Sequence, residues 1–221
     1  MARIFLAGAS RGVGREVARQ LIINGHQVSA LLRSDNAKDD LTAMKVDVVR
    51  GDALNEELMG QLIGQISPDA VISTIGGLPS DTGVRVDFLG NKHLVDAAVA
   101  AQAKRFILVT SIGIGDSAQA LPPQALETLA PVLAEKEKAE AHLANSGLTY
   151  TVIRPGGLVS QPATDQEVLT ENTSVAGSIP RMGVAKLLVS CMESDRAKNK
   201  IFSAIDRSMQ RSTGDFEVVS L

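Results

Sequence analysis

Three glycines near the start of the chain constrain its fold more than any other feature. Gly8, Gly12 and Gly14 stand between residues 3–7, an apolar run typical of a buried strand, and residues 15–22, whose apolar spacing is helical. At a strand-to-helix turn, such glycines permit a tight turn, a close approach of backbone to a pyrophosphate, and close packing of helix on strand. The helix N-terminus then offers free N–H groups to an anion. We therefore expect a dinucleotide site here, the alternative being a purely structural turn. The expected contacts of this loop are Gly8, Ser10, Arg11, Gly12, Val13 and Gly14.

Apolar runs alternate with helical patterns along the rest of the chain. This alternation predicts an α/β fold, a single-domain Rossmann-like doubly wound parallel sheet of about seven strands. One domain is expected over residues 1–221, with a small loop-rich acceptor flap at about 156–182. The expected strands are 3–7, 26–33, 45–49, 69–75, 104–110, 148–154 and 200–205, and the main later helices are 55–64, 84–102, 122–145 and 182–193.

Composition excludes several classes of protein. The net charge is −3, which gives no reason to expect a nucleic-acid or membrane-surface partner. No apolar run reaches the roughly 18 residues that span a bilayer, and the sequence begins directly with a strand, so no signal peptide is expected. A single cysteine, Cys191, leaves no internal disulfide and no Cys-rich metal site. We expect a cytoplasmic protein, a monomer or weak dimer, with no metal.

The end of the second strand indicates which dinucleotide binds. Sites selective for NAD carry an acid about 20 residues past the glycines, and a base stands there where a 2′-phosphate is accepted. Here residues 30–32 are apolar and position 33 is Arg33, while Arg11 adds a second positive charge. These residues predict NADP(H). Arg33 as a solvated loop cation is the alternative, and Asp35 is weak evidence against NADP(H).

Polar or small residues also follow the third, fourth and fifth strands, at the ligand side of such a sheet. Asp52 borders the cofactor, caps the helix at 55–64, or does both. Gly76 permits close backbone approach, and Ser111 either bonds cofactor or acceptor or bonds its own backbone. The expected cofactor contacts beyond the glycine loop are Arg33, Asp52, Ala53, Thr74, Ile75, Gly76, Ser111, Pro155, Gly156 and Gly157.

Together with the glycine loop and Arg33, the motifs Gly51-Asp52, residues 110–113 and residues 151–157 carry a family resemblance. The chain resembles an atypical short-chain dehydrogenase/reductase of the NmrA-like group, and among these the biliverdin-IXβ reductase/flavin reductase type. The resemblance implies that the residues matching Arg11, Val13, Arg33, Asp52, Gly76 and Ser111 border the cofactor and that residues 155–157 lie by the nicotinamide. Atypical members usually carry Gly where this chain has Arg11.

One family feature is missing. Many short-chain reductases use Tyr-x-x-x-Lys, with the Tyr as general acid. The single tyrosine here, Tyr150, lies in a predicted strand with Arg154 four residues on. Lys136 lies in a segment that resembles the family's lysine-bearing helix, but four residues before it stands Val132. Lys136 is therefore either a lysine retained without its tyrosine or a solvated helix lysine.

The missing general acid limits which acceptors the protein can be expected to reduce. Reduction of a simple ketone places charge on oxygen, so a positioned acid contributes about 10²–10⁴-fold. Flavins, bilins and quinones delocalise the charge and need it less. We therefore predict an NADPH-dependent reductase that passes hydride directly to FMN, FAD, a bilin or a quinone, with Ser111 and Lys136 as candidate catalytic residues. A non-catalytic NADP(H) sensor and an assembly factor remain as alternatives.

Overall fold

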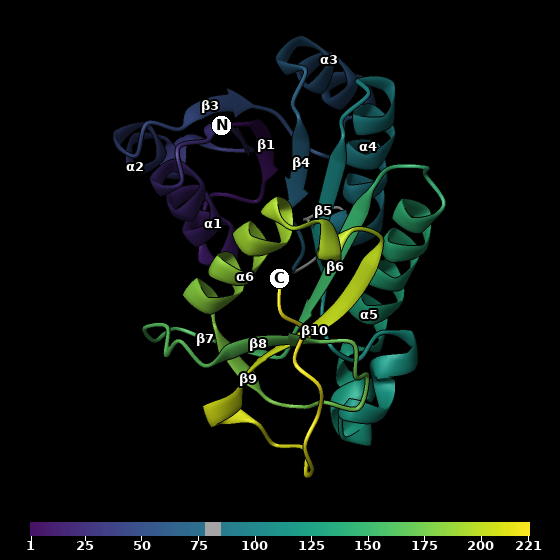
Figure 1. The fold of residues 1–221 in the computed structure, drawn as a ribbon. Helices are drawn as coiled ribbons and strands as arrows, with labels where there is room; N and C mark the ends of the chain where they lie inside the picture. The colour runs from purple at the N-terminus through teal and green to yellow at the C-terminus, as the bar shows by residue number, and fades with distance from the viewer. Residues whose placement is uncertain (78–84) are drawn as a thin grey trace.

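A computed structural model describes residues 1–77 and 85–221 of the chain, and these form one layered α/β unit (Figure 1). The helices are α1 (Gly12–Ile23), α2 (Lys38–Ala43), α3 (Glu56–Ile66), α4 (Val86–Ala100), α5 (Pro123–Ala144) and α6 (Arg181–Glu193). The strands are β1 (Arg3–Ala7), β2 (Gln27–Leu32), β3 (Asp47–Arg50), β4 (Ala70–Ser73), β5 (Arg105–Val109), β6 (Tyr150–Pro155), β7 (Gly157–Val159), β8 (Glu167–Thr170), β9 (Ser178–Pro180) and β10 (Lys200–Asp206).

The central sheet has eight strands in the order β3-β2-β1-β4-β5-β6-β10-β8. Seven of them run parallel and match the seven predicted strands, so the fold class is confirmed. The eighth, β8, pairs antiparallel with β10 at the edge of the sheet, and β7 pairs with β9 in a separate two-stranded sheet. The sequence prediction missed these three short strands. They all lie within residues 156–182, a segment whose many turn-forming residues indicate loops rather than strands.

The sheet is buried on both faces, as its strands of continuous apolar residues require. Alternate side chains of β1 enter different cores: Ile4 and Leu6 pack with α1 and α6, whereas Phe5 and Ala7 pack with α3, α4 and α5. The two helix layers are visible on opposite sides of the sheet in Figure 1. Within the described ranges, no helix is both long and apolar enough to cross a membrane.

Strand order reverses between β1 and β4, and this reversal positions the site. The chain moves outward from β1 to β2 and β3, then returns to place β4 on the other side of β1. The loops at the carboxyl ends of β1 and β4 therefore diverge and leave a crevice, where ligands bind in open α/β sheets.

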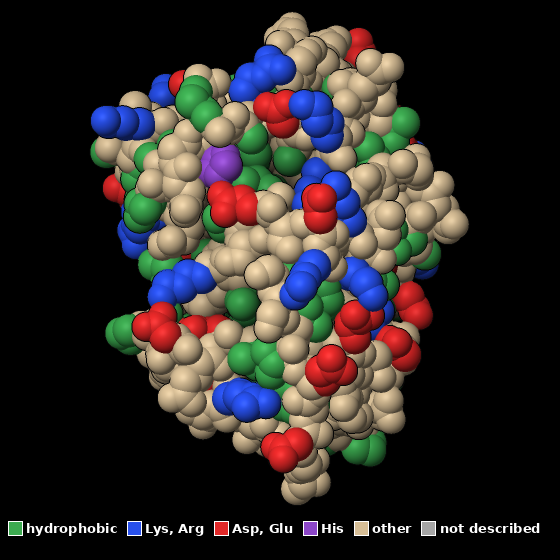
Figure 2. Space-filling view, viewed as in Figure 1, with side chains coloured by type: hydrophobic (Ala, Val, Ile, Leu, Met, Phe, Trp, Pro, Cys, Tyr) green, Lys and Arg blue, Asp and Glu red, His purple; other side chains and the backbone are tan. Residues whose placement is uncertain are grey.

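Figure 2 shows acidic and basic side chains interspersed over the viewed face rather than gathered into a field of one sign.

Candidate cofactor and acceptor site

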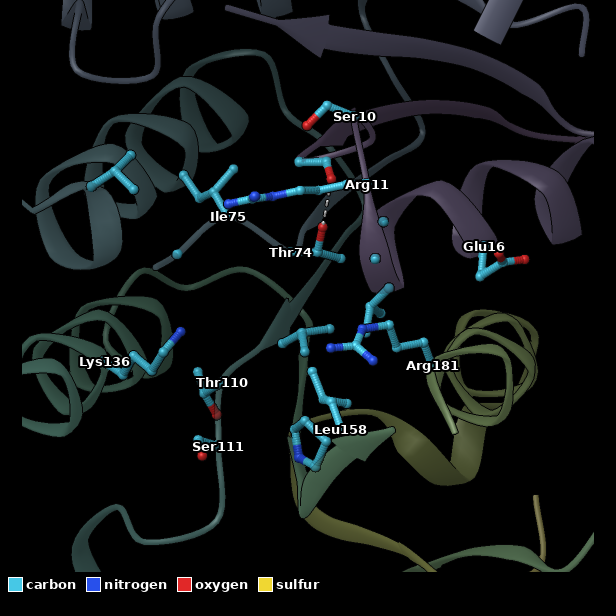
Figure 3. A pocket seen from close by; sticks show the side chains of 18 of the residues that line it. Ser10, Arg11, Glu16, Thr74, Ile75, Thr110, Ser111, Lys136, Leu158 and Arg181 are labelled. Atoms are coloured by element: carbon cyan, nitrogen blue, oxygen red, sulfur yellow. Dashed lines mark hydrogen bonds between the residues drawn. The ribbon is translucent and has the colours of Figure 1, made fainter. Parts of the chain in front are cut away.

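A cavity of about 1330 Å³ lies at the carboxyl ends of the parallel strands (Figure 3). Its size and position fit a dinucleotide with room beside it for a second molecule. Most of the predicted site residues come together in its lining: Gly8, Ser10, Arg11, Gly12, Val13, Gly14, Arg33, Asp52, Ala53, Thr74, Ile75, Gly76, Ser111, Lys136 and Pro155.

The glycine loop packs tightly against the end of β4, which explains why two of its positions are occupied by glycine. Gly8 has φ +97°, and a methyl group on it would lie 2.4 Å from the Thr74 hydroxyl. A methyl group on Gly14 would lie 2.2 Å from the Gly8 carbonyl oxygen. Thr74 donates its hydroxyl to the carbonyls of Ala7 at 3.2 Å and Gly8 at 3.3 Å. The loop is thus held in one shape by contacts that leave no room for side chains.

The start of α1 is suited to an anion. Arg11 occupies the N-cap position in an extended conformation, and its side chain makes no capping hydrogen bond. The first turn of α1 carries no acidic residue. Its N–H groups and the positive end of the helix dipole therefore face the cavity, the arrangement that binds the phosphates of dinucleotides. These residues fit the expected pyrophosphate.

The end of β2 presents a cation to the same cavity. Arg33 is exposed and lines it, whereas Asp35 forms an ion pair with Arg50 at 2.8 Å outside the lining. Asp52 lines the cavity and accepts a hydrogen bond from the backbone N–H of Leu54 at 3.0 Å. The alternative role of Asp52 as helix cap is wrong, because Asn55 is the N-cap of α3.

Lys136 reaches the cavity from α5 and is held there by a buried carboxylate. Its ammonium lies 3.1 Å from Oδ1 of Asp87, a fully buried residue of α4, and its own side chain is only 14% exposed. A methyl group on Gly76 would lie 2.7 Å from Nζ of Lys136 and 2.6 Å from Asp87. The structure therefore excludes a solvated helix lysine and places Lys136 directly behind the Gly76 backbone.

A buried polar network supports the loop that carries Ser111. Thr110 donates to Glu140 at 2.6 Å, and Arg154 bonds both Glu140 at 2.7 Å and Asp116 at 2.6 Å. Burial acts to lower the pKa of Arg154, but its hydrogen bonds and proximity to Glu140 and Asp116 outweigh burial and raise it. Ser111 lines the cavity, and its hydroxyl donates to the carbonyl of Ile112 at 2.9 Å. A bond to nearby backbone is what the alternative, purely structural role of Ser111 predicts.

Two residues that the sequence predicts to contact the cofactor, Gly156 and Gly157, lie away from the lining. The backbone N–H groups of Gly156 and Gly157 bond the carbonyls of Ala204 and Gly177, at 2.9 and 3.0 Å. A methyl group on Gly156 would lie 2.4 Å from the Gly177 oxygen. These glycines therefore let the flap pack on the sheet. Tyr150 begins β6, at the end of the sheet opposite the cavity.

Sequence reasoning missed the apolar wall and one cation. Leu129, Val132 and Leu133 line the cavity from α5, and with Lys136 they share the spacing of one helical face, a signal that the sequence does contain. The flap adds the opposite wall, which includes the 39% exposed Leu158. Arg181, the first residue of α6, also faces the cavity.

A profile of a family described as NAD(P)H-binding matches residues 8–195. The chain belongs to this family. Membership confirms the predicted nicotinamide cofactor and agrees with the resemblance to atypical short-chain dehydrogenases/reductases. The chain has an NAD(P)-binding fold of the type found in oxidoreductases, and reductases are among the proteins it resembles.

Relatives in this family include proteins of different kinds. An uncharacterised chloroplastic protein of Arabidopsis thaliana is 32% identical and matches 93% of this chain and 77% of its own length. Sanguinarine reductase of Eschscholzia californica is 32% identical over 74% of this chain and 64% of its own length. The chain spans less than half of the TIC 62 proteins of rice, pea and Arabidopsis: 46%, 39% and 33%. The solved structure of ChuY, an anaerobilin reductase from Escherichia coli O157:H7, is similar to this chain with a TM-score of 0.85 and 29% identity. The match covers 95% of this chain and 100% of that one.

Proposed function

We propose that this chain is an NADPH-dependent reductase that passes hydride directly to a flat conjugated acceptor such as a flavin, a bilin or a quinone. One observation carries the proposal: among the described residues, the cavity lining contains no tyrosine, histidine or cysteine to act as a proton donor beside Ser111. An acceptor that delocalises charge needs no such donor. The reductase named by the ChuY structure and the sanguinarine reductase relative support the reaction class.

The chain's contribution in this scheme is to bind and orient. When bound, the reduced nicotinamide supplies the hydride. The glycine loop and the start of α1 would hold the phosphates of the cofactor. Lys136, fixed by Asp87, would hold hydroxyl groups of the cofactor near Gly76. Leu133 and Leu158 border the remaining space from α5 and from the flap. A flat ring packed between such walls is placed for direct transfer, because proximity and orientation are the main requirement.

Apolar walls also explain why the acceptor is expected to be large. Leu129 is 38% exposed and Leu158 is 39% exposed, so both present apolar surface at the cavity mouth. An aromatic acceptor that covers them removes this surface from water, which is favourable by about 25 cal/mol per Å². NADPH oxidation should be screened against FMN, FAD, riboflavin, bilins and quinones. Turnover restricted to small ketones would contradict the proposal, and NADPH binding without any turnover would favour a sensor.

Preference for the phosphorylated cofactor follows from the charges around β2. Arg33 and Arg11 line the cavity, and Asp35 is engaged by Arg50 at 2.8 Å, so it does not oppose a 2′-phosphate there. A hydrogen bond to a charged group is worth about 1.5–3 kcal/mol. Arg33→Ala should therefore weaken NADPH binding about tenfold or more and leave NADH binding nearly unchanged.

The measurement is a fluorescence titration of each cofactor in the absence of acceptor. Lys38→Ala is the matched control, because Lys38 is an exposed cation just beyond β2 that does not line the cavity. Equal affinity of the unmodified protein for NADPH and NADH would contradict the assignment, as would an equal loss for both cofactors in Arg33→Ala.

A further inference from the structure

Arg181 is a cavity-lining cation that no sequence motif assigns to the cofactor. It opens α6, which packs beside α1 on the same face of the sheet (Figure 1). Both helices begin at the cavity, so Arg181 lies opposite Gly12, the first residue of α1. A methyl group on Gly12 would lie 3.7 Å from Nε of Arg181 and 3.8 Å from its Cδ. Figure 3 shows the guanidinium pointing into the cavity from α6, with Lys136 on the far side.

The guanidinium of Arg181 uses only one of its N–H donors within the described residues. It carries five N–H donors in a planar fork. Within the part of the chain that the structure describes, it makes one hydrogen bond, from Nη1 to the hydroxyl of Ser160 at 2.8 Å, and no ion pair. Glu16, an acid of α1 that also borders the cavity, is engaged by Arg19 at 3.0 Å. A half-buried arginine fork beside free helix N–H groups is suited to a phosphate, which it can bind through two parallel bonds.

We propose that Arg181 binds the diphosphate of the dinucleotide from the side opposite the glycine loop, and that its bond to Ser160 transmits this binding to the flap. The diphosphate would then lie between the start of α1 and the start of α6. This inference rests on the proposed cofactor site but not on the identity of the acceptor.

The link to the flap gives Arg181 a second effect. Ser160 directly follows β7, whose Leu158 and Val159 form the apolar wall on the flap side. An Arg181 fixed by the diphosphate holds Ser160, and Ser160 fixes the end of that wall. Because Arg181 already bonds Ser160 at 2.8 Å, a bound diphosphate should stiffen this wall rather than create it, and the acceptor should bind second.

The first test separates the diphosphate from the 2′-phosphate. Binding of NADPH, NADH, ADP-ribose and adenosine 2′-monophosphate is measured without acceptor for Arg181→Ala and Arg181→Lys. Arg181→Ala should weaken NADPH, NADH and ADP-ribose alike by about tenfold. It should leave adenosine 2′-monophosphate unchanged, because that ligand has no diphosphate. Arg181→Lys keeps the charge without the fork and should lose less.

Lys186→Ala is the matched control. Lys186 is an exposed cation of the same helix, bound to flap residue Asp165 at 2.6 Å and outside the cavity lining, so its removal should change none of the four affinities. Unchanged ADP-ribose binding in Arg181→Ala overturns the proposal, and so does an equal loss with adenosine 2′-monophosphate. These are binding measurements, so absence of turnover with every acceptor would refute the reductase and leave this result standing.

The second test addresses the flap. Hydrogen exchange of residues 157–163 is compared with and without ADP-ribose. In the unmodified protein, ADP-ribose should slow exchange in this segment. Ser160→Ala should retain ADP-ribose affinity within about twofold and lose the added protection. Equal protection in Ser160→Ala would show that Arg181 does not connect the diphosphate to the flap.

Discussion

Gly14→Ala should damage both stability and cofactor binding, although alanine is normally the better helix residue. The new methyl carbon would lie 2.2 Å from the Gly8 carbonyl oxygen and 2.5 Å from the Thr74 hydroxyl, whereas ordinary contacts lie at 3.4–4 Å. Relief of this overlap requires α1 to move away from β1 by about 1 Å, and overpacking of this kind costs about 1–3 kcal/mol. The same movement displaces the N–H groups at the start of α1 from the phosphates.

Chemical denaturation and NADPH titration measure the two effects. Gly14→Ala should lower the free energy of unfolding by about 1–3 kcal/mol and weaken NADPH binding by about tenfold or more. The control is Gly64→Ala in α3, where an added methyl group meets nothing within 4 Å. That variant should gain about 0.5–1 kcal/mol from helix propensity alone. A Gly14→Ala protein as stable as the unmodified chain, with unchanged NADPH affinity, would refute the packing argument.

Three further substitutions or treatments test the account. Tyr150→Phe should retain most turnover, because Tyr150 starts β6 far from the cavity; a loss of kcat beyond about a hundredfold, the scale of a lost general acid, would contradict this. Ser111→Ala should slow turnover with a flavin only about two- to tenfold and equally at all pH values, because one hydrogen bond is lost; a loss confined to one side of a new pKa would show that Ser111 relays a proton. Burial raises the pKa of the Cys191 thiol to about 12, so a thiol reagent at pH 8 should label Cys191 only after unfolding, and labelling of the native protein would contradict its burial.

The features that sequence predicted well are local. The glycine loop, the seven parallel strands and Arg33 depend on spacing within a short segment, and the structure places them as that spacing requires. The helix at 122–145 is likewise found as α5, with Pro123 in its first turn.

The features that sequence missed depend on contacts between distant segments. Strand β8 has four residues and exists because it pairs with β10, so that Thr170 lies beside Ser203. The Lys136–Asp87 pair joins α5 to α4 and leaves no pattern in either segment. Gly156 matched a cofactor motif by sequence, but its environment is set by Gly177 on the far side of the flap.

The central claim is direct hydride transfer from NADPH to a conjugated acceptor, and an isotope measurement tests it most directly. Oxidation of NADPH by FMN is followed with cofactor deuterated at C4 on one face or on the other. The account predicts turnover that requires both NADPH and FMN and that slows with deuterium on only one of the two faces, because the cavity presents the cofactor to the acceptor from a single side. Tight NADPH binding with no oxidation by FMN, FAD, riboflavin, a bilin or a quinone would contradict it.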